Sequence, residues 1–187
     1  MRILIAGLLG GIVFFIWGAV AHMVLPIGQM GMKMATAEEP VLAALRDSVP
    51  GEGVYLIPGL APDKMSDQAA VKAYSEKAKA NPYAFVIYHP QGRDGMDMSA
   101  NLLKQFIADT LSSLVVTFVL ALGVFGFGKR VLTATALGLF SWLTVSVPYW
   151  NWYRFPLDFT IGSLLEQVLG WFLAGMAIAW WLGRRER

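Results

Sequence analysis

The sequence predicts an α-helical membrane protein whose four transmembrane helices carry a small α/β domain between the first helix and the second. Two observations lead to this fold class. Hydrophobic residues make up 56% of the 187-residue chain and charged residues only 15%, whereas about a quarter of a typical soluble domain is charged. The sequence also contains four apolar segments that are each long enough to cross about 30 Å of hydrocarbon as a helix.

The four apolar segments are separated by charged or helix-breaking residues. Because a chain in lipid must satisfy its backbone hydrogen bonds within the segment, each is expected to be a helix. Pro26 is expected to stop the first. The predicted spans are residues 1–26, 106–128, 131–150 and 159–183.

The first span also has a feature of a cleaved signal peptide. Ala19-Val20-Ala21 has the small-x-small pattern of a signal-peptidase site. The apolar stretch before it is longer than the usual core of about 7–15 residues in a signal peptide. We therefore expect the segment to be retained as a transmembrane helix, with cleavage as the alternative.

The basic residues beside the spans predict the orientation of the protein. Short cytoplasmic loops carry an excess of Lys and Arg. The opposite loop, residues 151–158, is rich in aromatic residues and has only Arg154. The N-in, C-in topology, with residues 184–187 as a cytoplasmic tail, places six basic residues on the cytoplasmic side: Arg2, Lys129, Arg130, Arg184, Arg185 and Arg187.

Residues 27–105 have the pattern of a small soluble domain on the extracytoplasmic side. Turn residues separate its elements, and Ser66 and Ser99 are in positions to cap helices. The order α-β-α-β-α suggests that the two strands form a parallel βαβ unit. The chain has no cysteine, so no disulfide supports the small core. The expected elements are helix 38–48, strand 54–57, helix 66–80, strand 84–88 and a helix from residue 99 into the second span.

Methionines gather on or beside this domain in two short runs. Thioethers favour Cu(I), and both histidines of the chain belong to the same side of the membrane in the predicted topology. A copper site is therefore one hypothesis, and flexible apolar contacts with helices, lipid or a partner are the other. The candidate ligands are Met30, Met32, Met34, Met96, Met98, His22 and His89.

Polar residues near the outer ends of the spans form a second candidate site. Ionisable groups are costly inside a membrane and are therefore candidates for function. The structural alternatives are an ion pair of Glu166 with Arg154, and Asp109 acting as a charge near the N-terminus of its helix. The predicted intramembrane cluster contains Glu166, Arg154, Asp158, Asp109 and Gln167.

Small residues four positions apart indicate where helices approach each other closely. Gly7 with Gly11, and Gly170 with Ala174, form such pairs. They permit packing either within the helix bundle or between two copies of the chain. A homo-oligomer through either pair is therefore a possible arrangement.

The composition and the motifs restrict the function. Charges in residues 27–105 nearly balance, which argues against nucleic-acid binding, and no known catalytic motif is present. We expect no catalytic residues and a non-catalytic accessory or scaffold subunit of a larger envelope complex, respiratory or metalloenzyme, with the bilayer and other membrane subunits as partners. The alternatives are a protein that handles Cu(I), with copper as its cofactor, and a membrane enzyme or proton-linked carrier that uses Glu166.

Three segments carry a resemblance to a known group of proteins. They are GLLGGIVFFIWGAVAHM near the start, IYHPQG in the domain and YWNWYRFPLDFT in the second half. The chain resembles an uncharacterised group of conserved hypothetical four-span inner-membrane proteins of bacteria. The resemblance implies a bacterial inner-membrane location and no activity. In that membrane, the orientation predicted from the basic residues places residues 27–105 in the periplasm.

Overall fold

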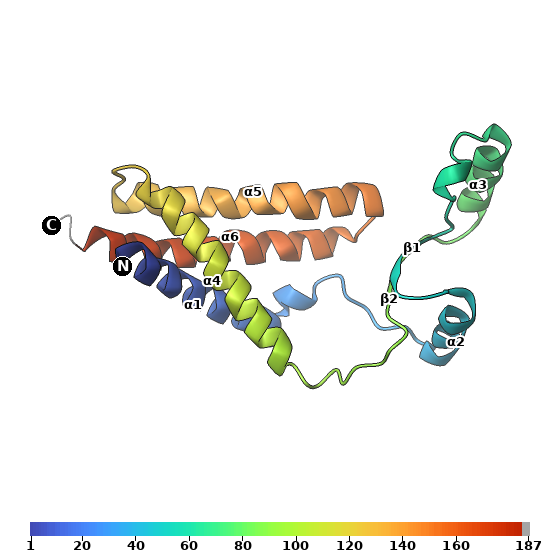
Figure 1. Cartoon of the computed structure of the whole chain (residues 1–187), viewed down its shortest axis with the longest axis horizontal. Coiled ribbons are helices and arrows are strands. Elements are labelled where there is room, and N and C mark those ends of the chain that lie inside the picture. The colour runs from blue at the N-terminus through green and yellow to red at the C-terminus, as the bar shows by residue number, and fades with distance from the viewer. Residues whose placement is uncertain (185–187) are drawn as a thin grey trace. The chain divides into compact units, whose positions relative to one another are not determined.

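The computed structural model describes residues 1–184 and divides the chain into two compact units (Figure 1). The membrane unit consists of Met1–Lys33 and the chain from Met96 onward, and the insert unit is Met34–Gly95. The insert unit is shorter than the predicted domain of residues 27–105. Its limits are narrower because the chain from Pro26 to Gln29 packs against helices of the membrane unit, and because the helix of the second span begins at Ser99.

Four helices of the membrane unit are long and apolar enough to span a membrane, which confirms the predicted number. Compared with the prediction, the second starts several residues earlier and the third is longer at both ends. The helices are α1 (Arg2–Met23), α4 (Ser99–Ala121), α5 (Phe127–Tyr153) and α6 (Leu157–Gly183).

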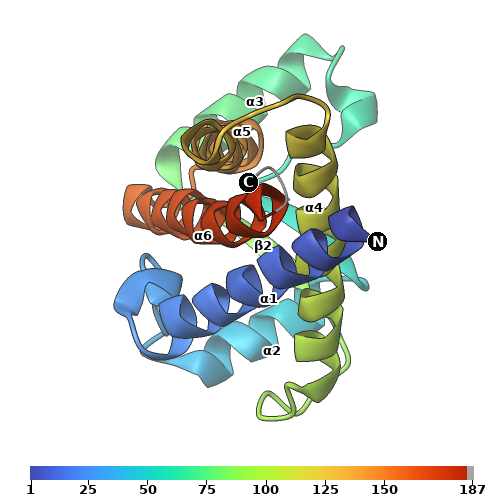
Figure 2. The same ribbon diagram turned by 90° about the vertical axis from the view of Figure 1, so that its left-hand side faces the viewer.

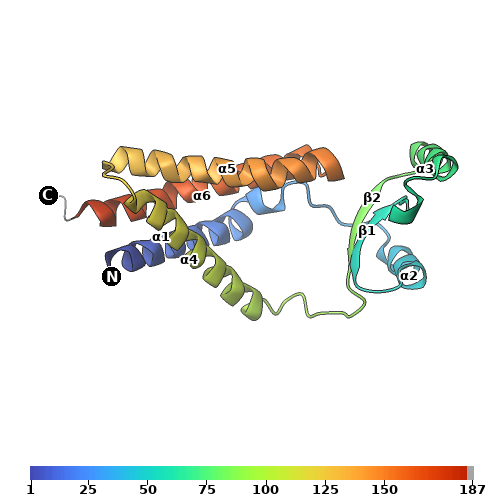
Figure 3. The same cartoon turned by 45° about the horizontal axis from the view of Figure 1, so that its top comes forward.

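These four helices pack in a row rather than in a closed ring. α5 packs along α6, α6 packs against α1, and α1 packs against α4, while α4 and α5 make few contacts. Figures 2 and 3 show α1 between α6 and α4, with α4 inclined across α1. Phe14 of α1 and Trp171 of α6 form the centre of the core, with ring centroids 4.7 Å apart. The start of α1 and the end of α6 lie at the same end of the unit (Figure 1).

Glycines allow the backbones of these helices to approach each other. A Cβ atom on Gly11 would stand 2.7 Å from the Thr110 Cα, and one on Gly7 would stand 3.0 Å from the Leu114 Cα, both in α4. A Cβ atom on Gly170 of α6 would stand 2.7 Å from the ring of Phe14 in α1. The small-residue pairs that offered a surface for a homo-oligomer therefore pack against helices of the same chain.

The insert unit contains two helices and a two-stranded sheet in the predicted order. The elements are α2 (Glu38–Ser48), β1 (Gly53–Ile57), α3 (Gln68–Ala80) and β2 (Ala84–Tyr88). The strands are antiparallel, with Gly53 opposite Tyr88 and Ile57 opposite Ala84, so the prediction of a parallel βαβ unit is wrong. A parallel pair needs a crossover that packs over the sheet, but α3 makes few contacts with either strand. The chain instead returns to the end of the sheet that it left.

An aspartate caps α3, where a serine was predicted, and another aspartate lies just before α4. Asp67 is the N-cap of α3 and its Oδ1 accepts hydrogen bonds from the Ala69 and Ala70 amides at 2.9 and 3.2 Å. Asp97 Oδ1 accepts hydrogen bonds from the Ser99 Oγ at 2.6 Å and the Ser99 amide at 3.1 Å. The N-cap of α3 is therefore Asp67 and not the predicted Ser66. Ser99 does not cap α4, whose N-cap residue is Met98 and makes no side-chain hydrogen bond.

The Asp97 contact leads to a prediction about pH. The hydrogen bonds from the Ser99 side chain and amide lower the pKa of Asp97 below its ordinary value of 3.8. A carboxyl group with a lowered pKa stabilises the fold above its unfolded pKa, and this contribution is lost as the pH falls through the folded pKa. An NMR titration of the Asp97 carboxyl should show a midpoint below 3.8, and Ser99→Ala should move it upward. A midpoint at 3.8 or above in the unaltered protein would contradict this contact.

Candidate functional site

The strongest candidate site is formed by His22, Asp109 and Glu166 in the membrane unit, which we call the acid–histidine site. His22 lies in the last turn of α1, and its Nε2 is 3.2 Å from the Glu166 Oε1 of α6. The two side chains are 51% and 25% exposed, so the pair lies at the edge of the helix row. This geometry is that of a hydrogen bond, or of an ion pair when the histidine is protonated.

Two further contacts hold this pair in place. The Trp17 indole Nε1 donates a hydrogen bond to the backbone carbonyl of Glu166 at 3.0 Å, which joins α1 to α6 one turn before His22. After α1 the chain turns back, and Gly28 lies directly against the His22 ring, where a Cβ atom would collide with the imidazole. The imidazole is therefore confined between the returning chain and α6.

Asp109 supplies a second carboxyl group from α4. It is 5% exposed, accepts a hydrogen bond from the Gln105 Nε2 at 2.8 Å, and is close enough to Glu166 for the two carboxyls to interact electrostatically. Because α4 begins at Ser99, Asp109 lies well inside the helix, and its interpretation as a charge near the helix N-terminus is wrong. Two neighbouring carboxyls can share a proton, because like charges disfavour the doubly ionised state. Within residues 1–184 no three histidine or acidic side chains are placed to hold a metal ion together.

A buried polar stripe on α4 continues from this site and was not predicted from the sequence. Ser113 and Thr117 follow Asp109 at intervals of four residues, and both are 0% exposed. The Ser113 side chain lies directly against Gly10 of α1. Within residues 1–184 the hydroxyls of Thr110, Ser113 and Thr117 have no hydrogen-bond partner. The four-residue spacing in the sequence could have predicted this stripe, because residues four apart lie on one face of a helix.

The other members of the predicted polar cluster lie elsewhere. The Ser141 Oγ of α5 donates a hydrogen bond to the Gln167 Oε1 at 3.1 Å, so Gln167 faces α5. Asp158 is in the first turn of α6 and accepts a hydrogen bond from the Phe159 amide at 3.0 Å. Arg154 is the left-handed C-cap of α5, with φ of 57°. Glu166 is paired with His22 rather than with Arg154.

The candidate copper ligands are divided between the two units. Met34 and His89 belong to the insert unit, where the His89 Nδ1 is 3.3 Å from the Glu52 Oε1. Met32, Met96 and Met98 of the membrane unit are exposed. Met30 packs on Gly162 of α6. Gly162 is one turn before Glu166, which pairs with His22, so Met30 and His22 contact the same face of α6. Of the seven predicted ligands, His22 and Met30 are therefore the two that the contacts place on one helix face.

These observations define the class of protein. Four apolar helices joined by short turns and one inserted unit, with carboxyl groups between the helices, make this chain a multi-pass α-helical membrane protein. No family model matches the chain, and neither a curated protein nor a solved structure does.

Proposed function

We propose that the chain is a non-catalytic accessory or scaffold subunit, anchored in the bacterial inner membrane, whose insert unit binds a partner in the periplasm. The observation that carries this proposal is the small core of the insert unit. Val49 is its one buried hydrophobic side chain apart from a proline, and α2 and α3 contain no buried residue. A two-stranded sheet is marginally stable in water unless another element covers it.

One face of the two-stranded sheet is apolar and uncovered within the insert unit. Val54 and Ile87 are directly opposite each other and are 61% and 65% exposed. Leu56, two residues along the same face, is 46% exposed and pairs with Phe85. Cross-strand apolar pairs of this kind stabilise a sheet when they are buried, and contiguous exposed apolar surface marks an interaction site. The exposed pair supports a partner that completes this core.

The partner should be a larger envelope complex, because the chain is held in the membrane and its insert unit is proposed to face the periplasm. The basic residues beside the spans favour cytoplasmic termini and hence a periplasmic insert unit. An anchored domain whose core is completed by a partner gains stability only where that partner is present. Such a protein has the properties of an assembly or scaffold subunit.

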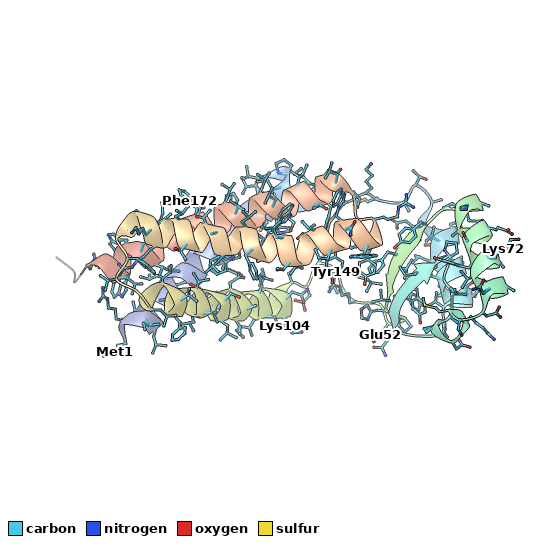
Figure 4. The ribbon with its side chains drawn as sticks, turned by 90° about the horizontal axis from the view of Figure 1, so that it is seen from above. Met1, Glu52, Lys72, Lys104, Tyr149 and Phe172 are labelled. Carbon is cyan, nitrogen blue, oxygen red and sulfur yellow. The ribbon has the colours of Figure 1, made fainter. Side chains whose placement is uncertain are left out.

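Site-specific photocrosslinking in native membranes tests the proposal. A photoreactive amino acid at Ile87 should give one discrete adduct, because the apolar face would be in contact with a partner. The matched control is Lys72, an exposed residue of α3 that projects from the insert unit (Figure 4), and it should give none. No adduct at Ile87, or equal adducts at both positions, would refute the proposal. An adduct of twice the mass of the chain would identify the partner as a second copy.

The acid–histidine site favours a second candidate function, a proton-linked or cation-binding role. The observation is that Glu166 lies beside both His22 and the buried Asp109. Uncompensated acids are costly in a membrane and are kept mainly where they act. Cu(I) is the metal that a histidine with a thioether such as Met30 would favour.

A further inference from the structure

The chain that follows α1 turns back over the acid–histidine site. We call residues 26–33 the strap; they begin with the short helix η1 (Pro26–Gln29) and end where the insert unit starts. η1 packs against both α1 and α6, the two helices that supply His22 and Glu166. Figures 1 and 3 show the strap as the light-blue segment after α1.

Two glycines fit the strap closely against α6. A Cβ atom on Gly162 of α6 would stand 2.8 Å from the Ile27 carbonyl oxygen and 3.0 Å from the Met30 Cβ. Gly31 has φ of 77°, and a Cβ atom on it would stand 2.7 Å from the Phe159 amide nitrogen at the start of α6. Glycine adopts such a φ without steric cost. The strap is therefore seated on α6 by contacts with its backbone.

The strap covers the nitrogen of His22 that Glu166 does not. The His22 Nε2 is 3.2 Å from the Glu166 Oε1. On the other side of the ring, a Cβ atom on Gly28 would collide with Nδ1. The side chain is 51% exposed as a whole, but each of its nitrogens, the atoms that exchange protons or bind metals, lies against a neighbour. The position of the strap thus decides whether Nδ1 is accessible.

We propose that the strap is a gate on the acid–histidine site, closed in this structure and open when the strap leaves α6. Opening would free the His22 Nδ1, while the hydrogen bond from the Trp17 indole to the Glu166 carbonyl would still join α1 to α6. The strap continues into the insert unit at Met34, so it is a covalent link between that unit and the site. Such regulation rests on the second candidate function, because a gate has a role only if the site acts.

Chemical modification of His22 tests the gate without measuring that function. Diethyl pyrocarbonate reacts with an accessible, unprotonated imidazole nitrogen, and the chain has only two histidines. In the purified whole chain at one fixed pH, mass spectrometry should find His22 modified more slowly than His89, which is 60% exposed. Gly28→Ala should speed the modification of His22 about fivefold, the equivalent of about 1 kcal/mol in favour of the open strap, at the lower end of the cost of overpacking.

A second variant and a control separate the gate from misfolding. Met30→Ala removes the side chain that packs on Gly162 and adds no atom, so it should fold even if Gly28→Ala does not, and it should also speed the modification of His22. Gly18→Ala, one turn before His22 in α1, places its Cβ atom where no neighbour lies within 4 Å, and it should change nothing.

The rates at His22 decide the outcome. An unchanged rate in folded Gly28→Ala and Met30→Ala proteins, or a rate at His22 equal to that at His89 in the unaltered protein, would overturn the gate. Either result would leave the second candidate function standing, because it concerns access to the imidazole and not the use of the carboxyls. Acceleration in both strap variants, with none in Gly18→Ala, would support the gate.

Discussion

Gly11→Ala is expected to lower the free energy of unfolding by about 1–3 kcal/mol, the usual cost of overpacking a tight contact. The new methyl group would stand 2.7 Å from the Thr110 Cα and 3.1 Å from its amide nitrogen. Both atoms belong to the backbone of α4, so no rotamer change can make room. The helices α1 and α4 would have to separate along their whole crossing, which also loosens the buried contacts near Ser113. Unfolding in mixed detergent micelles, followed by tryptophan fluorescence, measures the change.

Gly18 provides a matched control in the same helix. A Cβ atom there would have no neighbour within 4 Å, and alanine is a better helix former than glycine by up to about 1 kcal/mol. Gly18→Ala should therefore leave the stability unchanged or raise it. If the two variants behaved alike, the close crossing of α1 and α4 would be wrong.

The sequence was sufficient to predict the membrane spans because their signal is local. Length, hydropathy and helix-breaking residues are properties of one segment, and each predicted span overlaps an observed helix. The element order in the insert unit could be predicted for the same reason. The strand direction could not, because it depends on where α3 packs, and this is a tertiary property. Short-range patterns do not encode that contact.

The candidate site was predictable by residue type but not by pairing. Glu166 was recognised because an acid in an apolar segment is costly wherever it lies. Its partner is His22, separated from it by 144 positions in the chain, and helical periodicity gives no information on such a distance. The rotation of α6 about its axis decides that Glu166 meets α1 while the adjacent Gln167 meets α5.

Asp109→Asn is expected to raise the free energy of unfolding by about 1–3 kcal/mol, the cost of an imperfectly satisfied buried charged group. Asp109 is 5% exposed, its hydrogen-bond partner is the neutral amide of Gln105, and the nearby charged group is the carboxyl of Glu166. Asparagine has nearly the same shape and can still accept that hydrogen bond. The measurement is the same unfolding titration used for the glycine variants.

Asp158→Asn is the matched control and should have the opposite sign. Asp158 is exposed in the first turn of α6, where a negative charge interacts favourably with the helix dipole, so its loss should cost up to about 1 kcal/mol. A destabilised Asp109→Asn protein would show that the carboxyl is structural, and it would remove the second candidate function.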